Sequence, residues 1–102
     1  VILVPRIAGV TEWFDLAEGE RATLLNETLA LGKAMQTLFN AEKINTAALG
    51  NVVSQLHVHV VARYARDAAW PAPTWGFGQA EPYESAALIN TLDRLSRELP
   101  SL

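Results

Sequence analysis

The sequence predicts one α+β domain in which two amphipathic helices pack on an antiparallel sheet. Three observations support this prediction. The chain has 102 residues and is 50% hydrophobic, which is enough for one core. Two segments repeat apolar residues at helical spacing, and short β-rich runs alternate with turn formers. We expect residues 1–102 to form a single domain.

A strand comes first, and a long helix follows it. The β-rich run 1–6 predicts a strand that stops at Pro5, because proline cannot donate to a strand ladder. The stretch DLAE at residues 15–18 has the pattern of a capping box, which predicts a helix that starts there and runs to about residue 40. The apolar face of this helix, expected to pack on the sheet, carries Leu24, Leu25, Thr28, Leu31, Met35, Leu38 and Phe39.

Two further strands, a loop and a second helix complete the prediction. Residues 43–49 and 55–64 are β-rich, and Gly50 and Asn51 between them favour a turn, so the two strands should form an antiparallel hairpin. Residues 65–82 are rich in proline and glycine and are predicted to be irregular. The second helix ends at Pro100, and its apolar stripe carries Ala87, Leu88, Leu92, Leu95 and Leu99.

The composition excludes several classes of function. Without cysteine the chain has no disulfide, thiolate metal site or cysteine nucleophile, which suits the cytoplasm, where we expect the protein. The net charge of -3 gives no basic field for polymeric nucleic acid. No apolar run approaches the ~20 residues of a membrane span, so we expect no membrane partner. The chain opens on Val1 inside a predicted strand, and we expect that N-terminal strands are missing.

Both histidines of the chain lie on one predicted strand. Side chains alternate between the faces of a strand, so one face of this strand is polar and the other belongs to the core. The polar face carries Gln55, His57, His59, Val61 and Arg63, and the core face carries Leu56, Val58 and Val60. At a rise of about 3.3 Å per residue, the two histidines stand roughly 7 Å apart.

Three interpretations of this histidine pair are open. The imidazoles could be structural or solvent-facing. They could share a metal ion, although a carboxylate would have to supply the third ligand that a catalytic zinc site usually needs. In the third interpretation one imidazole attacks an electrophile while its neighbour orients it or stabilises charge.

The order of motifs resembles a known family. The histidine triad (HIT) superfamily has the signature His-φ-His-φ-His-φ-φ, with φ apolar, and residues 55–61 read Gln-Leu-His-Val-His-Val-Val. The run ILVPR, the long helix and the LGN turn occur in the family's order, so the resemblance covers roughly residues 1–66. The chain is thus similar to a bacterial HIT-like nucleotide hydrolase, with glutamine in place of the first triad histidine.

The resemblance implies a fold and an assembly. HIT proteins have an α+β fold with an antiparallel sheet of about five strands, a long helix and a C-terminal helix, and they commonly form homodimers. Two strands that precede the ILVPR strand in the family are absent from this sequence. Because those strands supply much of the nucleoside pocket, the preferred base is not carried over.

The resemblance also implies an activity. Family members hydrolyse or transfer nucleotides by attack on an α-phosphate, as in a dinucleoside polyphosphate or a phosphoramidate. The nucleophile falls on His57 and its orienting partner on His59. Phosphate contacts fall on Gln55 and on three further positions, Asn45, Gly50 and Asn51, although Gly50 is equally explained as a turn former. No cofactor or metal is required, and Mg²⁺ could accompany a polyphosphate substrate.

Gln55 departs from the family pattern. An amide can donate a hydrogen bond to phosphate but cannot act as a general acid, so we expect a preference for leaving groups that need little protonation, such as a nucleotide phosphate. The alternative is a nucleotide-binding module with little or no turnover.

Arg63 and the aromatic loop are less specific signals. Arg63 could meet a phosphate, but a solvated strand-end arginine is the stronger expectation. The stretch WPAPTWGFG places three aromatic residues, Trp70, Trp75 and Phe77, in a loop. Stacking on a base is one use for them, and covering the core or a dimer surface is the favoured one.

Overall fold

The computed structural model describes residues 1–99. Its elements in chain order are the strand β1 (Ile2–Leu3), the 3₁₀ turn η1 (Trp13–Asp15), the helix α1 (Glu18–Phe39), the strands β2 (Lys43–Ala47) and β3 (Val58–Arg63), and the helix α2 (Ser85–Glu98). Pro100, predicted to end the second helix, lies outside the described residues. The predicted strand–helix–strand–strand–helix order and the α+β class are confirmed.

The three strands form one antiparallel sheet in the order β1-β3-β2, so β3 is the central strand. β3 pairs with β2 from Lys43↔Arg63 to Ala47↔His59, which confirms the predicted hairpin. On its other edge β3 pairs with β1, where Ile2 is the partner of His59. His59 is therefore held by backbone ladders on both sides.

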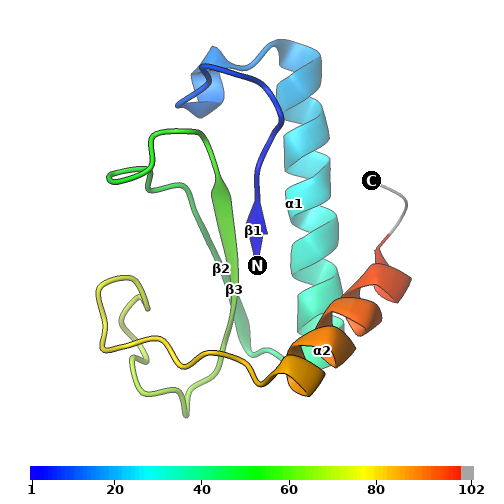
Figure 1. The fold of residues 1–102 in the computed structure, drawn as a ribbon, viewed down its shortest axis with the longest axis vertical. Helices are drawn as coiled ribbons and strands as arrows, with labels where there is room; N and C mark the ends of the chain where they lie inside the picture. The colour runs from blue at the N-terminus through cyan, green and yellow to red at the C-terminus, as the bar shows by residue number, and fades with distance from the viewer. Residues whose placement is uncertain (100–102) are drawn as a thin grey trace.

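Helix α1 covers one face of the sheet, and the long loops lie on the other side (Figure 1). The core is built where α1 meets β3: Leu31 is 1% exposed and Val60 is 0% exposed. Of the predicted apolar face of α1, Leu25 is an exception at 50% exposed. The helix ends at Phe39, after which Asn40 takes a left-handed conformation with φ 51°.

The predicted capping box at residues 15–18 is wrong. The carboxylate of Asp15 accepts hydrogen bonds from the backbone N–H groups of Thr11 and Glu12, at 3.3 and 3.0 Å, so it closes the η1 turn instead of starting α1. Helix α1 begins at Glu18, and there the carboxylate of Glu20 accepts from the N–H of Ala17 at 2.7 Å.

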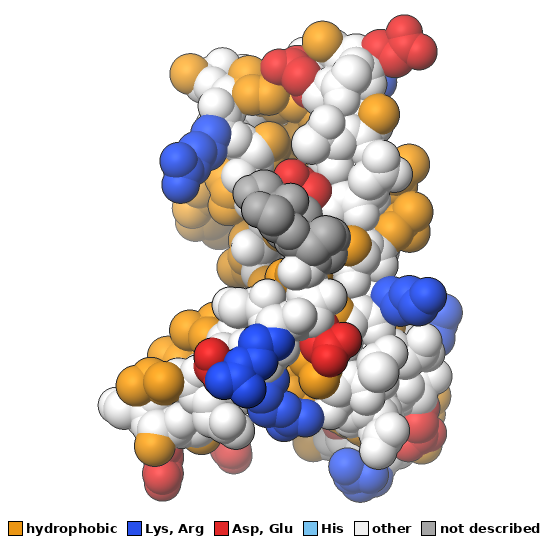
Figure 2. Space-filling model, turned by 90° about the vertical axis from the view of Figure 1, so that its right-hand side faces the viewer, with side chains coloured by type: hydrophobic (Ala, Val, Ile, Leu, Met, Phe, Trp, Pro, Cys, Tyr) orange, Lys and Arg blue, Asp and Glu red, His pale blue; other side chains and the backbone are white. Residues whose placement is uncertain are grey.

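Helix α2 packs across the C-terminal end of α1 through Leu95, the buried residue of its apolar stripe. Arg94 reaches back to donate to the carbonyl oxygen of Leu38 at 3.0 Å. Figure 2 shows the helical side of the molecule, where acidic and basic side chains are interspersed and no histidine of the described residues is visible. Within residues 1–99, neither helix combines the length and apolar character that crossing a membrane would require.

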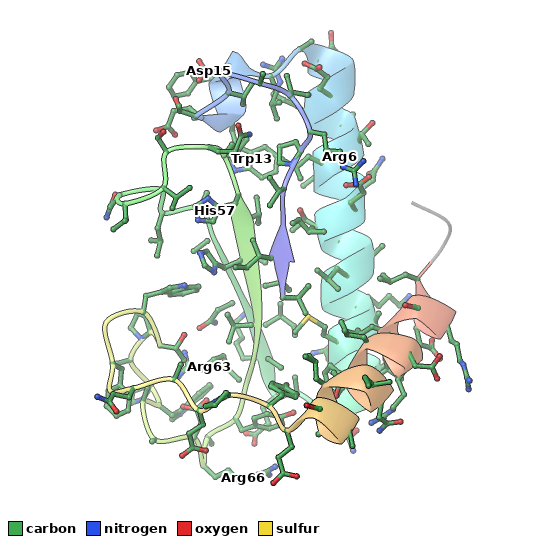
Figure 3. The ribbon with its side chains drawn as sticks, in the orientation of Figure 1. Arg6, Trp13, Asp15, His57, Arg63 and Arg66 are labelled. Carbon is green, nitrogen blue, oxygen red and sulfur yellow. The ribbon has the colours of Figure 1, made fainter. Side chains whose placement is uncertain are left out.

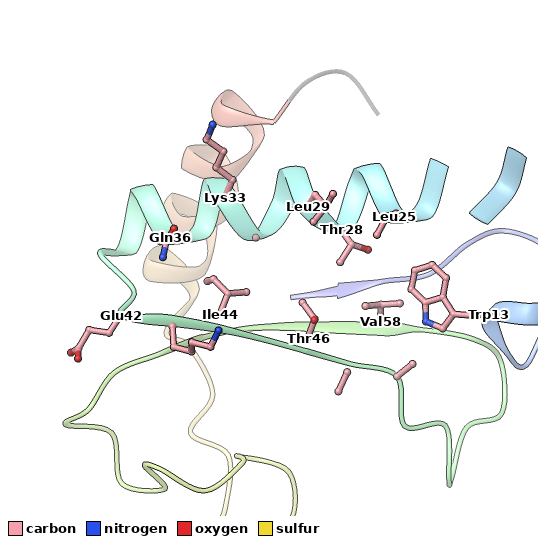
Figure 4. Close-up of a pocket in the computed structure, with 14 residues that line it drawn as sticks. Trp13, Leu25, Thr28, Leu29, Lys33, Gln36, Glu42, Ile44, Thr46 and Val58 are labelled. Atoms are coloured by element: carbon pink, nitrogen blue, oxygen red, sulfur yellow. The ribbon is translucent and has the colours of Figure 1, made fainter. Parts of the chain in front are cut away.

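A groove of about 640 Å³ runs between α1 and β2 (Figure 4). Leu25 and Leu29 of α1 form one wall and Ile44 of β2 forms the other, while Trp13 closes one end. The opposite end is polar and carries Lys33, Gln36 and Glu42. The groove opens on the outer edge of β2, which has no strand neighbour among the described residues.

Candidate active site

The two histidines lie on the face of the sheet that α1 does not cover. His57 immediately precedes β3, and Figure 3 shows it on the side of that strand away from α1. His59 is the second residue of β3, and the ring centroids of the two imidazoles are 5.2 Å apart at an interplanar angle of 63°. Leu56, Val58 and Val60 alternate with them and are buried. The predicted division of this strand into a core face and a histidine face is therefore confirmed for these residues.

A backbone hydrogen bond fixes the tautomer of His57. Its Nδ1 lies 2.7 Å from the carbonyl oxygen of Gln55. A carbonyl oxygen can only accept, so Nδ1 carries the proton and donates it. In the neutral imidazole Nε2 then holds the free lone pair. This is the arrangement that a histidine nucleophile requires.

His59 lies in the middle of the sheet, paired with β1 on one side and β2 on the other. It is half-buried between the two ladders, with Ala47 opposite it on β2. Burial lowers the pKa of His59, and the nearby charge of protonated His57 lowers it further. His59 therefore favours the neutral form, which can accept as well as donate a hydrogen bond.

Gln55 is engaged with the backbone of the segment after β1. Its Nε2 lies 3.4 Å from the carbonyl oxygens of both Pro5 and Ile7. The side chain thus connects the histidine strand to the segment that enters η1. These two bonds already use the N–H donors of the amide group. The role of Gln55 as a phosphate contact stays a prediction.

The three other predicted phosphate contacts lie in different surroundings. Gly50 lines a small cavity together with His57, and its φ of 71° is in the left-handed region that favours glycine. Asn51 is exposed at the tip of the same loop. Asn45 lies on β2 opposite Val61, and its Oδ1 accepts a hydrogen bond from Arg63 at 2.8 Å. The structure brings Gly50 close to His57 and holds Asn45 at the other end of the face.

Arg63 is not solvated, which corrects the favoured prediction. Its residue exposure is 1%, because the loop 64–84 folds back over this end of the sheet. The guanidinium donates to both carboxylate oxygens of Asp67, at 2.8 and 3.0 Å, and to the carbonyl oxygen of Ala72 at 2.8 Å. It also lies over the ring of Trp70, 5.6 Å from the centroid.

The carboxylate of Asp67 is equally well satisfied. Besides Arg63, it accepts from the backbone N–H groups of Tyr64 and Trp70, at 3.0 and 2.8 Å. The hydrogen bonds from Arg63, followed by that from Tyr64, hold the pKa of the Asp67 carboxyl far below its usual range. The ionised form of Asp67 is therefore favoured, which maintains its pairing with Arg63.

Trp75, one of the three loop aromatics named from the sequence, lies beside the histidine pair. Its ring lies 5.6 Å from the imidazole of His59 at an interplanar angle of 76°. The sequence favoured a core or dimer role for the three loop aromatics, and Phe77 is 53% exposed. Thr11 and Glu12 also line the small cavity beside His57, and no motif in their stretch could have indicated this.

Within residues 1–99 there is no group of three or more histidine, cysteine, aspartate or glutamate side chains that could hold a metal ion. Among these described residues, no carboxylate completes a set of three ligands with the two imidazoles. The histidine face thus holds the imidazole of His57, with Nδ1 bonded to the Gln55 carbonyl oxygen, and the imidazole of His59 beside it.

The sequence model of the HIT domain matches residues 1–66, which include β1, α1 and the entire hairpin with both histidines. The chain is a member of the HIT family. A comparison with curated proteins found no match. HIT proteins bind nucleotides and are in general hydrolases or transferases of nucleotides.

Solved structures of bacterial HIT proteins share this fold along nearly the whole chain. A histidine triad protein of Sinorhizobium meliloti is 44% identical, with a TM-score of 0.94 over 96% of this chain and 73% of its own. One from Bradyrhizobium japonicum is 40% identical, with a TM-score of 0.93 over 96% and 73%. One from Marinobacter aquaeolei is 42% identical, with a TM-score of 0.92 over 96% and 72%.

Proposed function

We propose that this HIT protein cleaves a dinucleoside polyphosphate, or a related nucleotide, through a covalent nucleotidyl-histidine on His57. The observation that carries the proposal is the bond from Nδ1 of His57 to the carbonyl oxygen of Gln55 at 2.7 Å, which leaves Nε2 free to attack. His57 lies on the side of β3 away from α1 (Figure 3) and is only half-buried, which supports access for a substrate phosphate.

The reaction has two steps. Nε2 of His57 forms a bond to the α-phosphorus, and the bond from phosphorus to the leaving-group oxygen breaks, with the electron pair departing on that oxygen. Water then attacks the phosphorus, the phosphorus–nitrogen bond breaks, and a nucleoside monophosphate is released while the proton of water passes to solvent. A transferase would use another hydroxyl in place of water. No resident cofactor is required, and Mg²⁺ on the substrate would neutralise its phosphates.

The covalent intermediate can be detected directly. The protein is incubated with a dinucleoside polyphosphate, quenched in base, which preserves phosphorus–nitrogen bonds, and measured by intact-mass spectrometry. We expect the wild type to gain the mass of one nucleotidyl group. The His57→Ala variant should show no gain, since its strand lacks the attacking nitrogen.

The outcomes separate the two functions that the sequence left open. An adduct on wild type alone supports the hydrolase or transferase. Nucleotide binding without adduct and without released monophosphate would overturn it in favour of a binding module. An adduct that persists in His57→Ala would place the nucleophile elsewhere.

We also propose that the protein forms a homodimer through the α1–β2 groove, with a second copy as the occupant. Leu29 is 62% exposed on the wall of this apolar groove. The edge of β2 that has no strand neighbour within residues 1–99 lies beside it, and exposed strand edges are normally covered or paired. The polar end offers both signs of charge through Lys33 and Glu42, so a two-fold contact can pair each with the other copy.

A charge placed in the groove should break this dimer. We expect the wild type to elute as a dimer, and Leu29→Arg to elute as a monomer because a guanidinium would be buried without a partner. Light scattering coupled to gel filtration measures the mass. Leu92→Arg is the matched control, because Leu92 is 53% exposed on α2 and does not line the groove. A monomeric wild type, or a control that dissociates equally, would exclude this interface.

A further inference from the structure

We infer that Arg63 is a positioning residue for the histidine face: by fixing residues 67–72 of the returning loop, it holds Trp75 against His59. Arg63 itself does not touch the imidazoles. It acts through the loop, and the inference rests on the proposed function only for what His59 does in turnover.

The Arg63 side chain connects three separate parts of the chain. The guanidinium projects from β3, donates to Asn45 on β2, and donates to Asp67 and Ala72 in the loop. Three of these contacts are 2.8 Å long, and the side chain is fully enclosed. Such a planar set of donors fixes direction as well as distance, which a lysine ammonium cannot reproduce.

Trp75 lies only three residues after Ala72, the last residue of the loop that Arg63 contacts. Trp75 follows Ala72, whose carbonyl oxygen is held by Arg63, with one proline and Thr74 between them. The N–H of Ala72 in turn donates to the carbonyl oxygen of Ala69 at 2.8 Å, so the segment before Trp75 is fixed at both of its backbone groups. Trp75 has little freedom to leave the histidine face while this anchor holds.

Trp75 contributes to the enclosure of His59. Its cross-strand partners are Ile2 and the small residue Ala47, and the other ring beside it is His57. The indole of Trp75 packs edge to face against the imidazole, with the ring centroids 5.6 Å apart. Edge-to-face ring contacts of this kind favour one orientation of both rings. Losing the anchor should free Trp75 and allow His59 to rotate and rehydrate.

The test is proton NMR of the two imidazoles, recorded for every variant at one fixed pH above 8. Only two histidines are present, so His57→Ala assigns their signals. We expect Trp75→Leu to remove the ring-current shift from the His59 protons, and Arg63→Lys to move these signals in the same direction. The double variant should show no shift beyond that of Trp75→Leu, because both changes act through one contact.

The matched control is Arg66→Lys, since Arg66 is exposed and stacks on Tyr64 at 4.7 Å without holding the loop. It should leave His59 unchanged. Arg63→Lys with wild-type His59 signals, or effects that add in the double variant, would overturn the inference. Should Arg63→Lys fail to fold, Asp67→Asn removes a charge from the same anchor and must shift His59 in the same way. These signals are read without substrate, so their result stands apart from that of the adduct experiment.

Discussion

Replacing His57 with alanine is expected to lower kcat for a dinucleoside polyphosphate by on the order of 10⁴-fold or more. The variant lacks the nitrogen that forms the phosphorus bond, and no cysteine is present to take its place. The measurement is release of nucleoside monophosphate under saturating substrate.

The fold of this variant should survive, because the His57 side chain is only half-buried and makes one bond to the backbone. We expect a destabilisation of about 1 kcal/mol, measurable by thermal unfolding. His59→Ala is the contrasting control: it should turn over more slowly yet still form the covalent adduct, since the attacking nitrogen remains. Retention of more than a tenth of wild-type turnover by His57→Ala would contradict the mechanism.

The second large effect is a gain of activity. We expect Gln55→His to raise the turnover of a nucleoside phosphoramidate by about 10²-fold, the lower end of what a positioned general acid contributes. An amine must be protonated as it leaves, and an amide side chain cannot supply the proton. In the wild type we accordingly expect a dinucleoside polyphosphate to react faster than a phosphoramidate.

The surroundings of Gln55 suit this exchange. Its amide lies 3.4 Å from the carbonyl oxygens of Pro5 and Ile7, so an imidazole there can donate to one of them and keep its second nitrogen for the leaving group. Gln55→Asn is the control, because it keeps an amide and should not gain activity. If the wild type cleaves the phosphoramidate clearly faster than the dinucleoside polyphosphate, proton supply does not limit turnover at this site.

Periodic segments are the part of the fold that the sequence predicts well. The apolar repeat along α1, the alternation along β3 and the glycine between the strands each follow from local rules, and all three elements are present. The start of α1 was misplaced because a carboxylate at Asp15 satisfies two patterns. It could cap a helix that begins directly after it or close the turn before it, and the N–H groups of Thr11 and Glu12 are nearer.

The site was predictable only where it lies on that regular framework. His57 and His59 follow from the alternation of β3, but the burial of Arg63 depends on partners four and nine residues downstream in an irregular loop. Such a loop has no period from which its path could be read. Trp75 reaches His59 only because the loop returns over the sheet, so a local pattern could not distinguish it from Phe77.

The central place of β3 also restricts which changes of length this chain can accept. The strand side chains alternate with a period of two, so one residue inserted between Val60 and Arg63, with the pairing of Arg63 kept, would turn both imidazoles toward α1 and expose the apolar side chains that alternate with them. The same insertion would therefore disrupt the hydrophobic core and remove the histidines from their face of the sheet. Insertions and deletions in relatives should therefore be confined to segments outside the ladder, such as 48–54 and 76–84, where length can vary while the spacing of the histidines stays constant.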